Sequence, residues 1–167
     1  MRAFEANEVW EWYRNHGMSE EVDADGRHTV RPADVSTLRF DERLEFNTRG
    51  NAPGLRDVAE RALRAAGSWQ ECLVVYVLWG VWSSAEDWPR FYAWRGHHGV
   101  RLSLEDAPGH LFLISELPEL TELLTQTFEF GWECHVFFSS GDSSIRSHVF
   151  VSHDGWLRIQ SDAPFTL

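Results

Sequence analysis

Apolar and polar residues recur along the chain with two different periods, and these periods predict its helices and strands. A repeat of three to four residues predicts helices over residues 53–66 and 116–128, each with one apolar stripe. A less regular pattern predicts a helix over residues 2–15. A fourth helix should begin near Asp87, because Pro89 disfavours helical backbone at the residue before it.

The helix over residues 116–128 has the clearest faces. Ser115 is a suitable N-cap, and a proline is tolerated in the first helical turn. The spacing turns one set of apolar side chains toward the core: Leu117, Leu120, Leu124 and Phe128. Polar side chains are expected on the opposite side of this helix.

Alternation with a period of two predicts strands. Residues 72–79 are apolar on both alternating faces, which is typical of a central strand that is covered on both sides. Residues 38–46 alternate between apolar and mostly charged positions and predict a strand or hairpin with one wet face. The acidic residues 19–25 predict a loop instead.

The last third of the chain predicts an antiparallel meander. Strands over residues 132–139 and 144–152 flank Gly141-Asp142, and Asp154-Gly155 leads into a further strand. Both dipeptides suit two-residue hairpin turns. With no break in composition, we expect a single globular domain over residues 1–167. Its class is α+β (mixed α/β), with a central sheet, the antiparallel C-terminal meander and about four helices.

The charge of the chain narrows the class of partner. The formal net charge is −11, and all 15 basic residues are arginine. We expect a basic protein partner and no nucleic acid, because sequence-independent nucleic-acid binding depends on basic side chains. The longest apolar run, residues 73–79, is far shorter than the roughly 20 residues of a membrane span, and residues 1–11 lack the apolar segment of a signal peptide. A cytoplasmic protein without membrane association is therefore expected.

The strongest charge asymmetry lies between Arg101 and Arg146. This interval holds no lysine or arginine, but it holds these acidic residues: Glu105, Asp106, Glu116, Glu119, Glu122, Glu129, Glu133 and Asp142. Glu119, Glu122 and Glu129 share the side of the predicted helix that lies opposite its leucines. A solvated face kept acidic for solubility explains the pattern. A surface for a basic partner, which would relieve the repulsion, explains it equally well.

Residues 79–95 read WGVWSSAEDWPRFYAWR and are unusually aromatic. Most of these rings have the spacing of core residues on a strand or a helix. The connecting loop carries Trp82, Glu86 and Asp87, and a tryptophan beside carboxylates is typical of a protein interface. If the sheet is parallel here, the loop also has the position of a ligand-binding loop. The alternative is that Trp82 folds back onto the core.

Histidines on the predicted meander raise the possibility of a metal site. A two-residue turn at Gly141-Asp142 places His135 opposite His148, with Glu133 on the same face. These side chains are zinc-ligand types, although polar faces of antiparallel strands also carry histidines that bind no metal. The chain has no nucleophile elbow or phosphate-binding loop, and we expect no cofactor.

Several blocks of the sequence resemble a known type of bacterial protein. The blocks are WGVWSSAEDWPRFYAWR, EDAPGHLFL, FGWECHVFF and SHDGW, within residues 69–156. They resemble an uncharacterised bacterial family similar to the immunity proteins of polymorphic toxin systems. The resemblance implies a small, acidic, cytoplasmic protein that occludes a cognate toxin, often a basic enzyme such as a nuclease. It carries over no toxin-contacting residue.

Two hypotheses follow. The first is an inhibitory protein that blocks a basic toxin without turnover, through Glu119, Glu122 and Glu129, with Trp82, Glu86 and Asp87. The second is a small metal-dependent enzyme that uses His135 and His148, with Glu133 or His153.

Overall fold

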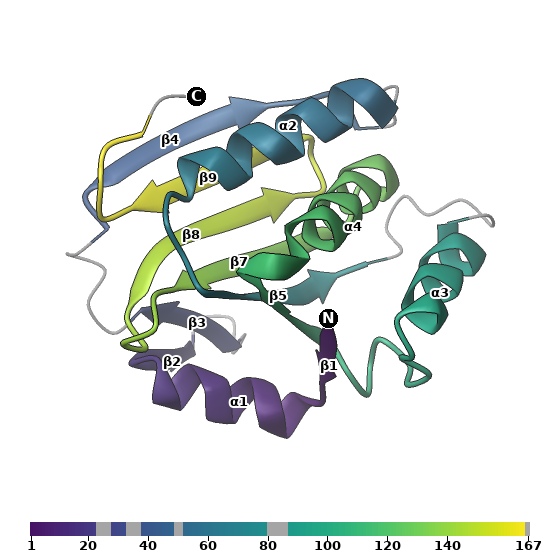
Figure 1. The fold of residues 1–167 in the computed structure, drawn as a ribbon, viewed down its shortest axis with the longest axis horizontal. Helices are drawn as coiled ribbons and strands as arrows, with labels where there is room; N and C mark the ends of the chain where they lie inside the picture. The colour runs from purple at the N-terminus through teal and green to yellow at the C-terminus, as the bar shows by residue number, and fades with distance from the viewer. Residues whose placement is uncertain (23–27, 33–37, 49–51, 80–86, 166–167) are drawn as a thin grey trace.

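A computed structural model places the chain in an α+β fold around one large antiparallel sheet (Figure 1). The structure describes residues 1–22, 28–32, 38–48, 52–79 and 87–165. The loop residues Trp82 and Glu86 lie outside these ranges. Among the described helices, none combines the length and the apolar character needed to cross a membrane.

The strands are, in chain order, β1 (Arg2–Phe4), β2 (Met18–Val22), β3 (His28–Pro32), β4 (Phe40–Glu45), β5 (Glu71–Leu78), β6 (Gly109–Leu113), β7 (Glu133–Ser139), β8 (Ile145–Ser152) and β9 (Trp156–Ser161). The helices are α1 (Ala6–Asn15), α2 (Ala52–Ala65), α3 (Asp87–His97) and α4 (Leu117–Phe130), and a 3₁₀ turn, η2 (Ile114–Glu116), directly precedes α4. The main sheet has the order β1-β6-β5-β7-β8-β9-β4, and β2 pairs with β3 in a separate ribbon. Every pairing is antiparallel, so the parallel arrangement considered around residues 79–95 is excluded for β5.

Strand β5 is covered on both faces from Cys72 to Tyr76, as its sequence predicted, whereas Val77 and Leu78 at its end are exposed. Its side chains Cys72, Val74 and Tyr76 belong to the main core, together with buried residues of α2 and α4. Leu73 and Val75 point the other way, into a smaller core under α1. Figure 1 shows α2 and α4 on one side of the sheet and α1 on the other.

The predicted helix over residues 116–128 is confirmed as α4, with two corrections at its start. The N-cap residue is Glu116, not Ser115, because η2 forms the preceding turn. Leu117 is exposed, whereas Leu120, Leu124 and Phe128 are buried as predicted. Leu117 has α-helical backbone angles and is the first residue of α4, so it lies at the end of the buried stripe, where the core no longer covers it.

The N-terminal segment differs from the predicted continuous helix. Arg2–Phe4 pairs with β6, and the helix begins only after Glu5, whose capping box with Glu8 fixes its first turn. The loop predicted over residues 19–25 is also wrong in its first part, because residues 18–22 pair with β3. Both strands depend on partners that are distant in sequence, which a local pattern does not reveal.

The β7–β8 hairpin has a longer connection than predicted. His135 pairs with Phe150, and His148 pairs with Phe137, so the predicted register is wrong by two residues. The strands end at Ser139 and Ile145, with an irregularity after Phe138. Since the shift is even, His135 and His148 still share a face, now as diagonal neighbours. The next turn is likewise longer than the two residues predicted. It has three residues, because Ser152 pairs with Trp156.

Gly109 tests the packing of β6 against the N-terminal segment. A Cβ atom here would lie 2.6 Å from Val9 Cγ2 and 2.9 Å from Phe4 Cβ. We expect Gly109→Ala to lower the free energy of unfolding by about 1–3 kcal/mol in urea denaturation. Gly96→Ala is the control, because its Cβ atom would meet nothing within 4 Å and alanine favours the helix. Equal stability of the two variants would contradict this packing.

Candidate functional site

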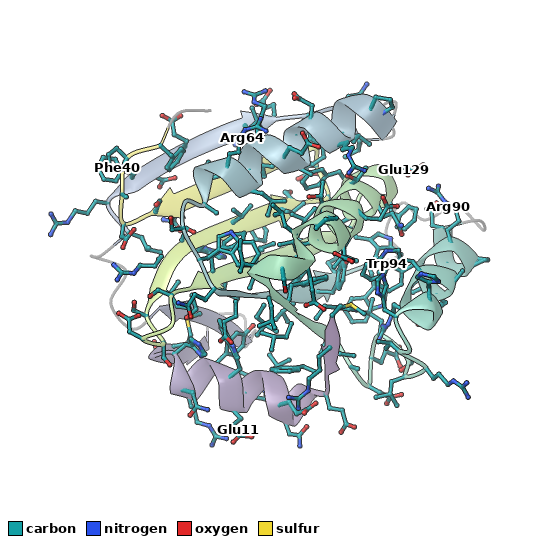
Figure 2. All side chains as sticks on the ribbon, in the orientation of Figure 1. Glu11, Phe40, Arg64, Arg90, Trp94 and Glu129 are labelled. Carbon is teal, nitrogen blue, oxygen red and sulfur yellow. The ribbon has the colours of Figure 1, made fainter. Side chains whose placement is uncertain are left out.

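Four carboxylates predicted to meet a partner lie on neighbouring helices. Glu119, Glu122 and Glu129 lie on α4, and Asp87 is the first residue of α3. We call these four residues the acidic face. Figure 2 shows Glu129 and Arg90 at adjacent ends of the two helices.

Arg90 of α3 binds the last carboxylate of the acidic face. Its Nη1 and Nη2 atoms each donate to one oxygen of Glu129, both at 2.8 Å. The hydrogen bond to Glu129 raises the pKa of Arg90, and the nearby charges of Asp87 and Glu122 act in the same direction. A single guanidinium therefore lies among three carboxylates.

Glu122 also has a cationic neighbour from another helix. Arg56 Nη1 of α2 lies 3.8 Å from its Oε2 atom, and the Gln126 amide donates to its Oε1 atom at 3.0 Å. The sequence places no lysine or arginine on α4 that could pair with the carboxylates of the acidic face. Arginines of α2 and α3 pair with these carboxylates instead. Helical spacing could not reveal these contacts, because they depend on how the helices pack.

Glu119 is the member of the acidic face without an arginine partner in the described chain. Its Oε2 atom is buried and makes no hydrogen bond. Its charge raises the pKa of His98, although burial dominates and lowers that pKa overall. Among the described residues, the three carboxylates of the acidic face that lie on α4 thus share two guanidinium groups, and one of these three carboxylates has no arginine partner.

The histidines proposed as metal ligands bind each other instead. His135 Nδ1 lies 2.9 Å from His148 Nε2, and His148 Nδ1 lies 3.5 Å from Gln160 Oε1. Burial, together with the neighbouring His148, lowers the pKa of His135 to about 3. Burial also lowers the pKa of His148 to about 4. One ring must accept the shared proton, so the two rings are not both charged, and the lowered pKa values keep the pair neutral near pH 7.

Glu133 is not the third member of this group. Its Oε2 atom binds His153 Nδ1 at 2.8 Å, and His153 Nε2 lies 3.4 Å from Asp154. No group of three or more metal-ligand side chains is assembled within the described ranges. The metal site considered as an alternative, with His135, His148 and Glu133, is therefore not assembled in this arrangement.

A buried polar pair that the sequence did not single out lies beneath α3. Arg95 and His110 are both completely buried. Arg95 Nη2 donates to the Ala107 carbonyl at 3.2 Å, but its Nε and Nη1 atoms have no partner. Neither ring nitrogen of His110 makes a hydrogen bond, and burial, together with the Arg95 charge, lowers its pKa to about 3. Arg95 follows the buried Phe91 by about one helical turn and lies on the same face of α3. This spacing was the signal in the sequence that Arg95 would be buried.

In the described part of the chain, no serine or cysteine side chain is hydrogen-bonded to a histidine ring, so these residues form no Ser–His or Cys–His pair. Comparison of the chain with protein-family models, with curated proteins and with solved structures gave no match. A functional proposal therefore rests on the residues of this chain.

The buried histidines predict a stability that falls in mild acid. His110, His135 and His148 stay neutral in the folded state, whereas in the unfolded chain they take up protons below about pH 6.5. The free energy of unfolding should be unaffected above that pH and fall from about pH 6.5 down to about pH 4 for His148 and about pH 3 for His110 and His135, by up to about 1.4 kcal/mol per pH unit for each histidine.

Urea denaturation at several pH values measures this effect. His110→Phe should reduce the slope by one histidine's share, because it removes a buried group that resists protonation. His97→Gln is the control, since His97 is exposed. A slope that is the same in wild type and His110→Phe would contradict the burial of a neutral His110.

Proposed function

We propose that this protein is an inhibitory binding protein of the immunity type, which covers a basic protein toxin in the cytoplasm and blocks it without turnover. The observation that carries the proposal is the residual negative charge of the acidic face. Its arginine partners are half-exposed, and such ion pairs contribute little to stability. Basic side chains of a partner can therefore replace Arg56 and Arg90 at small cost.

Electrostatic complementarity would act mainly on the rate of encounter. The net charge of −11 attracts a basic protein from a distance, and the acidic face then orients it. The second hypothesis, a metal-dependent enzyme, gains no support from the described residues, because His135 and His148 bind each other and Glu133 binds His153.

Charge reversal on the acidic face tests the proposal against the protein product that co-purifies with the wild-type chain from its source cells. The double variant Glu119→Arg/Glu122→Arg should bind that product at least about tenfold more weakly, mostly through slower association. The difference should shrink at about 0.5 M salt, where exposed charges are screened. Binding kinetics and protection of cells that express the toxin provide the two measurements.

Glu11→Arg is the matched control. Glu11 is exposed on α1, and Figure 2 shows it on the far side of the molecule from Glu129. It changes the net charge in the same direction by two units, half the change of the double variant, without touching the acidic face, so its total effect should stay within about twofold. If Glu11→Arg weakens binding as much as the double variant does, or if neither changes it, the acidic face is not the binding surface.

A further inference from the structure

A groove with a volume of 560 Å³ lies at the end of the sheet where β5 begins. It lies between the C-terminal end of α1, the junction of β6 with η2, and the tip of the β7–β8 hairpin. Polar and apolar side chains line it, among them His16, Gln70, Glu71, Ile114 and Ser115. The functions considered above do not use this groove.

The carboxylate of Glu71 is held in a fixed position in the groove. Its Oε1 atom accepts a hydrogen bond from Trp12 Nε1 at 2.8 Å and lies 2.9 Å from His16 Nε2. His16 Nδ1 donates to the Trp12 carbonyl at 2.8 Å, and its ring stacks on the Trp12 indole with centroids 3.8 Å apart.

The other oxygen of this carboxylate is available. No described residue makes a hydrogen bond or ion pair with Glu71 Oε2, and the Glu71 side chain is 29% exposed. On the hairpin side, Asp142 is paired with Arg146 and accepts hydrogen bonds from Ser140 and Ser144. Glu71 Oε2 is therefore a pre-oriented acceptor that needs no rearrangement to receive a donor.

An apolar rim borders this acceptor. Leu113 is 52% exposed and Ile114 is 48% exposed, and both line the groove. Leu117, 39% exposed, follows one turn later. A fitting side chain would place an apolar stem on this rim and several N–H donors on Glu71, Gln70 and Ser115. Arginine combines these features, whereas the lysine ammonium is more strongly hydrated and offers a single point of charge.

We propose that this groove receives an arginine side chain of the protein partner, with the guanidinium on Glu71 Oε2 and the methylene stem on Leu113 and Ile114. That the donor comes from a basic partner rests on the proposed function and on the net charge of −11. The groove lies at the N-terminal end of α4, the end that carries Glu119, whereas Glu129 lies in its last turn, so this contact would extend the acidic face beyond the first turn of α4.

Titration with N-acetyl-arginine amide tests the groove without any partner. The indole N–H of Trp12 bonds to Glu71, so its NMR signal, assigned with Trp12→Phe, reports on this carboxylate. The signal should shift and saturate with N-acetyl-arginine amide. N-acetyl-citrulline amide, of similar shape but uncharged, should produce at least about tenfold weaker binding, because a charged donor to a carboxylate is much stronger. A shift that does not saturate, or equal binding of both compounds, would overturn the proposal.

Variants identify the atoms involved. Glu71→Gln should weaken binding of N-acetyl-arginine amide by about tenfold, and Glu11→Gln should leave it unchanged. Because Glu71 also holds Trp12 and His16, Ser115→Arg provides a second test that keeps these contacts: its exposed side chain should fill the groove and block the compound. Unchanged binding in Ser115→Arg would exclude this groove. If the titration shows no binding, the acidic-face variants still test the proposed function. If the protein fails to protect cells that express the toxin, the titration result still stands.

Discussion

The structure depends on covering strand β5 on both of its faces. Its side chains are apolar on both faces, so helices must pack on each side of the sheet: α2 and α4 on one side, and α1 on the other. The same requirement positions Glu71, whose side chain points to the α1 side with Leu73 and Val75. There its carboxylate contacts Trp12 and His16, which hold it in position in the groove. A core constraint thus creates a polar feature at the surface.

On the opposite side, α4 is enclosed more fully than its amphipathic pattern suggests. Thr121, Thr125, Gln126 and Thr127 are buried in addition to its leucines. The threonine hydroxyls donate to backbone carbonyls of the same helix, and Thr127 Oγ1 also lies 2.7 Å from the Tyr76 hydroxyl. With α2 and α3 close by, arginines of those helices reach the carboxylates of α4. Burial of α4 and pairing of its charges therefore have one cause.

Elements with a strong local pattern could be predicted from the sequence, and elements that depend on distant partners could not. Residues 53–66 and 72–79 formed the predicted helix and central strand, because their apolar spacing alone specifies which faces are buried. Strand β1 exists because β6 lies beside it, and the β7–β8 register depends on a five-residue connection that a Gly-Asp dipeptide does not encode. For the acidic face, its position on α4 was predictable, but its pairing with Arg56 and Arg90 required the packed helices. The Glu71 cluster joins residues 59 positions apart and left no local signal.

The distribution of arginine links the fold to its excess of negative charge. Two arginines connect separate elements: Arg90 joins α3 to α4, and Arg158 joins β9 to β4. A third, Arg95 of α3, is completely buried. With 26 acidic residues against 15 basic ones, arginines engaged in this way leave many carboxylates without a cation. Folding brings these carboxylates closer together than they are in the unfolded chain, so their repulsion reduces the stability of the isolated protein. The proposed basic partner would remove this repulsion on binding, and the free energy released would add to the affinity of the complex.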